Sequence, residues 1–322
     1  MRAMLRTFLI AATALVSQAA LAQSWPSKPI RIIVPFAAGG GSDFLSRLLS
    51  PKLTESLGQP VVVENQAGGG GLIGAERVAR SAPDGYTILS TTPSTHVTGL
   101  FLFKKLPYDP VKDFTPITAA VEPATCLVIN VNVPANSVKD YIEHVRRNPG
   151  KVFYGTGGIG SVFHMTGEMF NDQAGLKSAH VPYKGNAPLL TDLVGGQIAS
   201  GFMSLSTALP FVQSGKVKLL AVLEASRYPK LPNVPTVGET LPGYEKPSSW
   251  WGFFAPANMP APVLARIHGE IVKAIHAPDI RPKLEDNALI LIGNTPEQFA
   301  AQIKTGFEVY GRLIKTMGLQ PE

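Results

Sequence analysis

Three glycine-rich segments are the strongest candidates for chemistry in this sequence. They run over residues 39–41, 68–71 and 155–160; each follows a short apolar run typical of a strand and precedes apolar residues at helical spacing. The first N–H groups of a helix have no partner within it, and the helix dipole adds positive charge there. Glycines let an anion approach that backbone closely. The segments therefore predict sites for a carboxylate or a phosphate, held by main-chain donors.

Neutral groups would have to hold such an anion in two of these segments. The stretches from Pro35 to Phe44 and from Gly155 to His164 contain neither arginine nor lysine. Two G-x-G-x-x-G matches begin at Gly69 and Gly155, but neither is followed by the acid that a dinucleotide fingerprint places at the end of a second strand. No phosphate-binding G-K-[ST] ending is present. A nucleotide-binding oxidoreductase is therefore only a remote alternative.

Ser161 and His164 raise the question of catalysis. Their spacing places both side chains on one face of the first turn of a helix. A hydrolase would use them as nucleophile and base, but the chain has no G-x-S-x-G elbow and no acid placed to complete a triad. A ligand contact, or a plain N-cap role for Ser161, is the better interpretation, with an exported hydrolase as the alternative. The six histidines show no metal-ligand spacing, so we expect neither a metal nor a cofactor.

Five further positions admit a structural and a functional interpretation. Ser42 or Asp43 would cap the helix after the first glycine segment, or Asp43 would accept a ligand ammonium or orient a water. His96 follows the third predicted strand, at the carboxyl edge where α/β sheets bind ligands, and could equally be a surface histidine. Trp250 and Trp251 alternate across a strand, so at most one of them can face a cleft, and the other would pack in the core.

The elements that must position these residues alternate between strand and helix. Strands are predicted at residues 30–34, 61–63, 86–89, 152–154, 179–181, 198–203, 218–222 and 249–254. Alternation with helices predicts an α/β fold with parallel sheets and helices on both faces. Pro51 should kink or interrupt the first helix. A strand-like passage from 114 to 129 and the strand at 218–222 would carry the chain from one domain to another and back. We expect one domain at 23–122 plus 226–322, another at 123–225, and a ligand cleft between them.

Composition narrows the class of protein. With 322 residues, 45% hydrophobic and 16% charged, the chain is not disordered and is long enough for two domains. A single cysteine, Cys126, excludes an internal disulfide. Residues 1–22 combine a basic start, an apolar stretch and an A-x-A-type ending, which predicts a signal peptide cleaved after Ala22 and a periplasmic protein. Its loss lowers the net charge from +6 to +4, because it holds two arginines and no acid. The remaining basic residues are scattered and do not indicate a nucleic-acid partner.

Seven motifs follow one another along the chain: WPSKPI at 25–30, IVPFAAGGGSD at 33–43, GQPVVVEN at 58–65, APDGYT at 82–87, LPYDP at 106–110, HVPYKG at 180–185 and LPNVPT at 231–236. Together they resemble the Bug/TctC family, the substrate-binding proteins of tripartite tricarboxylate transporters. The resemblance runs in order from residue 25 to about 318. It implies a type II-like periplasmic binding protein fold, with two discontinuous domains joined by two crossover strands. It also implies a non-enzymatic protein, expected to be a monomer, that closes around a small organic acid and delivers it to a large and a small membrane permease subunit.

The resemblance further implies which loops touch the ligand. The loop from Phe36 to Asp43 would contact a proximal carboxylate, partly through ordered waters, and the loop from Thr156 to Ser161, with His164, would contribute from the second domain. The candidate ligand contacts are Phe36, Ala38, Gly39, Gly40, Ser42, Asp43, Thr92, His96, Thr156, Gly157, Gly158, Ser161, His164, Lys184, Met203 and Ser204.

One position departs from the family's pattern. Many members resemble Phe-Asp-Asn where this chain has Phe202-Met203-Ser204. An acid there would suit a ligand amine, whereas a thioether and a hydroxyl leave a less polar wall. We therefore hypothesise a preference for a dicarboxylate with an aliphatic or aromatic body over an amino acid. The identity of the ligand, and any signalling to a sensor kinase, stay open.

Overall fold

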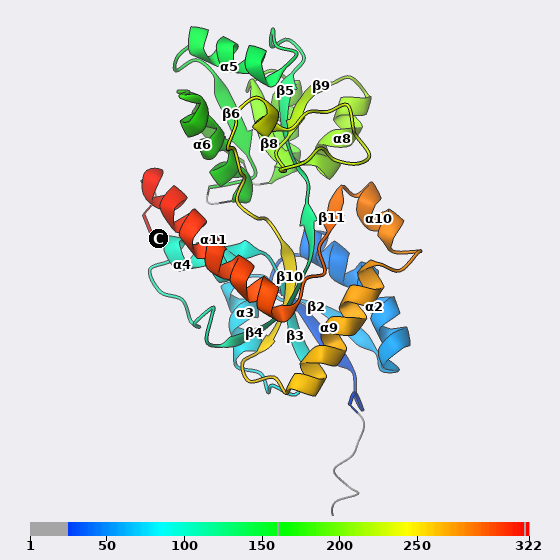
Figure 1. Cartoon of the computed structure of the whole chain (residues 1–322). Coiled ribbons are helices and arrows are strands. Elements are labelled where there is room, and N and C mark those ends of the chain that lie inside the picture. Colours follow the sequence, from blue (N-terminus) through cyan, green and yellow to red (C-terminus); the bar gives the residue numbers. More distant parts are fainter. Residues whose placement is uncertain (1–24, 160, 184, 319, 322) are drawn as a thin grey trace, which may run out of the picture.

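The computed structural model describes residues 25–159, 161–183, 185–318 and 320–321. The expected signal peptide and its cleavage site lie outside the described residues. Two sheets organise the chain (Figure 1). We call the six-stranded sheet with its helices lobe 1, and the five-stranded sheet with its helices lobe 2.

Lobe 1 is built on the sheet order β11-β4-β10-β3-β1-β2. Its strands are β1 (Ile30–Val34), β2 (Val61–Asn65), β3 (Thr87–Thr91), β4 (Phe114–Pro123), β10 (Trp251–Pro256) and β11 (Leu289–Leu291). Its helical elements are α2 (Gly41–Leu57), η1 (Gly69–Gly71), α3 (Leu72–Ala79), η2 (Ser94–Thr98), α4 (Gly99–Leu102), α9 (Ala261–Ile275), α10 (Arg281–Asp286) and α11 (Pro296–Thr316). Pro51 lies within α2, which continues past it, so of the two expected effects, a kink or an interruption, the interruption is wrong.

Both faces of the lobe 1 sheet are buried. On one face, Ile32 belongs to a core cluster with Leu49 of α2 and Ile271 of α9. On the other face, its neighbour Ile33 packs in a cluster with residues of α3 and with Phe299 of α11. This explains why the apolar residues Ile32, Ile33 and Val34 follow one another in β1 instead of alternating with polar ones.

Lobe 2 has the sheet order β7-β6-β8-β5-β9. Its strands are β5 (Thr125–Asn130), β6 (Phe153–Thr156), β7 (Ala179–Pro182), β8 (Ser200–Ser204) and β9 (Val217–Val222). Its helical elements are α5 (Val138–Arg147), α6 (Val162–Ala174), α7 (Asn186–Val194), α8 (Leu205–Gln213) and η3 (Val237–Glu239). Residues of α5 and α6 share a core cluster on one face of the sheet, and residues of α7 and α8 share one on the other.

The expectation of parallel sheets is wrong in part, because both sheets are mixed. Strand β1 is parallel to β2 and β3, and β6 is parallel to β7 and β8. Strand β10 runs antiparallel to β3 and β4, and β5 runs antiparallel to β8 and β9. The reason is the crossing between lobes. Strand β4 carries the chain out of lobe 1 and its neighbour β10 brings it back, so the two run in opposite directions. Strand β5 likewise carries the chain into lobe 2 and its neighbour β9 carries it out.

Two passages of the chain join the lobes (Figure 1). The predicted strand at 114–129 is two strands, β4 and β5, separated only by Ala124 and belonging to different sheets. After β9 the chain returns through the proline-rich segment 223–250, which contains only the short η3, and enters β10. None of the helices in the described part of the chain combines the length and the hydropathy needed to cross a bilayer.

Candidate functional site

A cavity of about 670 Å³ lies between the two lobes. Lobe 1 contributes the start of α2, the end of β4, the first residue of β10 and the stretch around β11. Lobe 2 contributes the first turns of α6, α7 and α8. The lining residues are Gly39, Gly40, Gly41, Phe44, Pro123, Phe163, Gly185, Asn186, Ser204, Ser206, Thr207, Trp251, Asn287 and Leu289.

Three helices present uncapped N-termini to this cavity. The N-cap residues of α2, α7 and α8 are Gly40, Gly185 and Ser204, and none of them accepts a side-chain capping hydrogen bond. All three line the cavity. The first N–H groups of each helix therefore need a partner from outside it, and the three dipoles favour negative charge between them. One terminus comes from lobe 1 and two come from lobe 2, so unpaired helix N–H groups face the cavity from both sides.

The described lining residues carry no charged side chain. The polar side chains that line the cavity are the amides of Asn186 and Asn287 and the hydroxyls of Ser204, Ser206 and Thr207. These groups and the helix N–H donors can hydrogen-bond carboxylate oxygens without an arginine or a lysine. Of the three glycine segments that the sequence singled out, only the first, residues 39–41, stands at one of these three uncapped helix starts.

Asp43 supports the first glycine loop from within. It is 4% exposed, and its Oδ2 accepts the Gly39 N–H at 2.9 Å. Its Oδ1 accepts both Arg47 Nε–H and Asn65 Nδ2–H at 2.9 Å. Asn65 also donates to the Phe36 carbonyl at 3.2 Å, which ties the loop to β2. Burial pushes the pKa of Asp43 upward, but these hydrogen bonds outweigh it and hold the pKa below its usual value.

The prediction that Ser42 or Asp43 caps α2 is wrong, because Gly40 is the N-cap. Asp43 sits in the first turn and reaches back to the loop, as an acid in a capping box does. The consequence for binding is direct. With Asp43 turned toward its own loop, and a glycine at the cap, the N–H groups at the start of α2 are left to a ligand.

Aromatic rings form the apolar part of the cavity wall. Phe44 and Trp251 come from lobe 1 and Phe163 from lobe 2. Trp250 is 1% exposed and packs edge-on against Phe299, with ring centroids 4.9 Å apart. The prediction that only one of the two neighbouring tryptophans faces the cleft is confirmed.

Part of the third glycine segment, residues 155–160, has a structural role. Ser161 caps α6: its Oγ accepts the His164 N–H at 3.2 Å and donates to the Gly158 carbonyl at 2.8 Å. Its hydroxyl is therefore used by its own loop. Thr156 Oγ1 lies 2.7 Å from His180 Nε2. Gly157 lies next to Asn186, a residue that lines the cavity: a Cβ built on Gly157 would be 3.2 Å from Asn186 Oδ1.

His164 lies in a separate cavity of about 280 Å³, with Glu168, His180 and Met317 among its lining residues. Its imidazole stacks on that of His180, with ring centroids 3.8 Å apart. Burial, and the second imidazole beside it, lower the pKa of His164 to about 3. Burial likewise lowers the pKa of His180 to about 4. Near neutral pH both rings are uncharged.

Two sequence candidates lie in the protein core. His96 is fully buried and stacks on Phe254, with centroids 3.9 Å apart, and its Nδ1 lies 2.9 Å from Thr95 Oγ1. Burial lowers its pKa to about 3. The surface-histidine interpretation is therefore wrong. Met203 is fully buried beside Leu189 and Leu193, so its thioether does not form the cavity wall, because the side chain points to the α7 face of β8.

The cavity thus brings together only part of the predicted set. Gly39, Gly40 and Ser204 line it; Phe36, Ala38, Ser42 and Asp43 belong to the same first loop. Thr92 lies just beyond β3, with its Oγ1 2.8 Å from Ser94 Oγ. Lys184 lies outside the described residues. Sequence reasoning missed several lining residues: Gly41, Phe44, Pro123, Phe163, Gly185, Asn186, Ser206, Thr207, Asn287 and Leu289.

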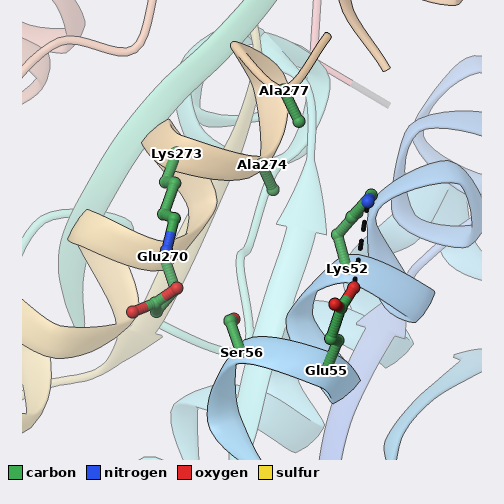
Figure 2. A pocket seen from close by; sticks show the side chains of 7 residues that line it. All are labelled: Lys52, Glu55, Ser56, Glu270, Lys273, Ala274 and Ala277. Carbon is green, nitrogen blue, oxygen red and sulfur yellow. Dashed lines mark ion pairs between the residues drawn. The ribbon is translucent and has the colours of Figure 1, made fainter. Parts of the chain in front are cut away.

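Another cavity, of about 350 Å³, lies on lobe 1 between α2 and α9 (Figure 2). Its charged side chains have both signs, two lysines and two glutamates. Lys52 pairs with Glu55 at 3.8 Å and with Asp279 at 3.2 Å. This cavity therefore lacks the neutral, uncapped donors that favour an anion in the cavity between the lobes.

Comparison with known proteins identifies the family. The model of the family described as "Tripartite tricarboxylate transporter family receptor" matches residues 45–319. The chain belongs to the TctC family. A TctC relative from Pseudomonas sp. (strain P51), named "UPF0065 protein in tcbD-tcbE intergenic region", is 35% identical over 97% of this chain and 93% of its own length. The resemblance stated from sequence is confirmed, and the family description is that of a receptor.

Two solved structures show the same fold with bound acids. A protein from R. palustris with adipate has a TM-score of 0.82 and 32% identity, covering 92% of this chain and 100% of that one. MatC from Rhodopseudomonas palustris, with bound malate, has a TM-score of 0.75 and 31% identity, covering 90% of this chain and 100% of that one. The chain therefore has the two-lobed α/β fold of TctC periplasmic binding proteins.

Proposed function

We propose that this TctC protein captures a small dicarboxylate in the cavity between its lobes. The observation that carries the proposal is the convergence of uncapped helix N-termini from both lobes on one cavity. A ligand with a carboxylate at each end can meet the start of α2 with one and the starts of α7 and α8 with the other. Such a ligand binds best when both walls are close, so it favours the closed arrangement of the lobes.

The energetics are adequate for this scheme. Micromolar affinity corresponds to about 8 kcal/mol. Hydrogen bonds to a charged group contribute about 1.5–3 kcal/mol each, so four or five suffice before ordering costs. The structure offers main-chain donors at three helix starts and five polar side chains.

The body of the ligand is apolar in this proposal. Phe44, Phe163 and Trp251 offer aromatic surface between the two polar walls, and an aliphatic or aromatic chain fits against them. An amino acid fits less well, because the described lining has no carboxylate to pair with its ammonium group. This supports the preference inferred from sequence, on the aromatic wall rather than on Met203. Adipate and malate in the two related structures are dicarboxylates.

The partners and location follow from the family. We propose that the two lobes close as two rigid domains in the periplasm, after cleavage behind Ala22. The loaded protein, a monomer, then delivers its acid to a large and a small membrane permease subunit. A receptor is favoured over a hydrolase because the Ser161 hydroxyl is engaged with the Gly158 carbonyl.

Titration calorimetry on the mature protein tests the proposal. Adipate, terephthalate, malate and aspartate are the probes, with hexanoic acid as the control that keeps the chain length of adipate but has one carboxylate. We expect at least one of adipate, terephthalate and malate, which have two carboxylates and no ammonium group, to bind at least tenfold more tightly than hexanoate and aspartate, and to be recovered unchanged. Tightest binding of aspartate, or turnover of the bound acid, would overturn it.

A further inference from the structure

A buried ion cluster lies where the chain crosses between the lobes. The side chain of Lys246 is 6% exposed, that of Glu224 is 9% exposed and that of Glu122 is 19% exposed. The Lys246 ammonium pairs directly with Glu122, and its Nζ lies 3.5 Å from Glu224 Oε1. None of the three lines the cavity between the lobes.

The three residues come from different sides of the crossing. Glu122 is in β4 of lobe 1, paired in register with Ile290 of β11. Glu224 follows β9 of lobe 2, and its Oε1 accepts the N–H of Thr125 at the start of β5 at 2.8 Å. Lys246 is on the segment that returns to β10. One lysine on a crossing segment therefore holds one carboxylate from each lobe.

The balance of charge makes the lysine essential to this arrangement. Two carboxylates share one ammonium, and removal of the ammonium would leave two like charges out of water. Burial raises the pKa of Glu224. Burial also acts upward on Glu122, but Lys246 and Ser249 outweigh it and lower its pKa. Among the described residues, Tyr244, Tyr310 and Cys126 also face the two glutamates, and burial raises the pKa of all three, so they are neutral near pH 7.

The cluster adjoins the cavity wall without touching the cavity. Ser249 donates from its N–H at 2.9 Å and from its Oγ at 3.0 Å to Glu122 Oε1. Two residues further on, Trp251 lines the cavity, as does Pro123, the neighbour of Glu122. The two glutamates are attached to different sheets, so the cluster spans the junction between the lobes.

We propose that Lys246 is a positioning residue that fixes the angle between the lobes by holding Glu122 and Glu224 together. It thereby sets how readily the cavity opens and closes, although it makes no contact with what the cavity holds. The effect of Lys246 on ligand affinity rests on the proposed function, whereas its effect on the angle between the lobes can be measured without any ligand.

Distances between two spin labels, measured by pulsed electron–electron double resonance, test the inference. Labels at Lys139→Cys in α5 and Lys273→Cys in α9 occupy exposed positions on different lobes, and the native Cys126 is buried. The test variant is Lys246→Met, which keeps an unbranched chain without the charge. Arg147→Met is the matched control, because it breaks the exposed 3.2 Å pair with Glu143 within a single helix.

Without ligand, we expect Lys246→Met to widen the distance distribution at least twofold and Arg147→Met to leave it unchanged. Equal widths for a folded Lys246→Met protein and the native protein would overturn the inference. If Lys246→Met does not fold, Glu224→Gln decides, since it weakens only the attachment to lobe 2; an unchanged width in that variant would also overturn it. Failure of every organic acid to bind would refute the proposed function and leave this distance measurement unaffected.

Discussion

The indole ring of Trp251 lies against the Cα of Gly41. A Cβ built on Gly41 would be 2.1 Å from Cζ2 and 2.3 Å from Cη2 of that ring. Both residues line the cavity between the lobes, and Gly41 is the first residue of α2. Glycine is therefore required here by the approach of an aromatic side chain, which brings an apolar surface next to the donors at the helix start.

Gly41→Ala should weaken dicarboxylate binding. The added methyl group must displace the indole from the cavity wall, and we expect a loss of at least tenfold in affinity for adipate, about 1.4 kcal/mol. Gly40→Ala is the matched control, because its Cβ would meet only the Ala37 carbonyl at an ordinary 3.6 Å. Calorimetric titration of both variants measures the difference. Equal losses would mean that the indole does not shape the site.

Asp43→Ala should reduce both stability and affinity. The change removes the acceptor that the Gly39 N–H and the half-buried Asn65 amide share, and hydrogen bonds to a charged group contribute about 1.5–3 kcal/mol each. The loop before α2 then loses its support, so adipate binding should fall as well. Urea unfolding and calorimetry measure the two effects. Asn65→Ala keeps the bonds from Gly39 and Arg47 to Asp43, and a loss as large as that of Asp43→Ala would contradict a supporting role centred on Asp43.

Acid should destabilise the protein through the stacked pair His164 and His180. Their pKa values of about 3 and about 4 lie below the unfolded value near 6.5, so between these limits the unfolded chain binds protons that the folded chain does not. The stability contributed by the neutral rings is complete above pH 6.5 and is lost as pH falls toward 4. His164, whose side chain is 6% exposed, should account for about 2 kcal/mol between pH 7 and pH 5.

Urea unfolding at both pH values, on native protein and on His164→Phe, measures this effect. Phenylalanine keeps an aromatic ring against His180 but cannot bind a proton, so its loss of stability on acidification should be about 2 kcal/mol smaller. His276→Phe, at an exposed position, controls for the change of residue. A pH dependence of His164→Phe equal to that of the native protein would contradict the assignment.

The placement of the helix starts was predictable from the sequence, but the composition of the cavity was not. The first glycine segment precedes a helix, and Ser161 caps another, because these signals are local. Asn186 and Ser206 also stand at helix starts after predicted strands, so the same argument would have found them. Pro123, Asn287 and Leu289 carry no local signal, and only the pairing of β4 with β11 brings Pro123 and Leu289 together.

The two core residues illustrate a different limit. His96 lies just past the end of a strand, as a ligand contact would, but its ring is enclosed by Phe114 and Phe254, which come from distant strands. Met203 and Ser204 are consecutive in β8, so their side chains point to opposite faces, and sequence alone did not say which one faces the cavity. The mixed direction of the sheets escaped prediction for a similar reason, since it depends on where the chain returns from the other lobe.

Ser206→Asp should move stability and affinity in opposite directions. Ser206 lies in the first turn of α8 and lines the cavity, with its Oγ 2.7 Å from Ser204 Oγ. A carboxylate there complements the helix dipole and should raise the free energy of unfolding by about 0.3–1 kcal/mol. The same charge occupies the donors offered to the ligand and repels its carboxylate, so adipate affinity should fall more than tenfold. Ser206→Asn is the control, because asparagine has nearly the size of aspartate but no charge; both variants are measured by calorimetry and urea unfolding. If Ser206→Asp and Ser206→Asn weakened adipate binding equally, the start of α8 would not contribute to anion binding.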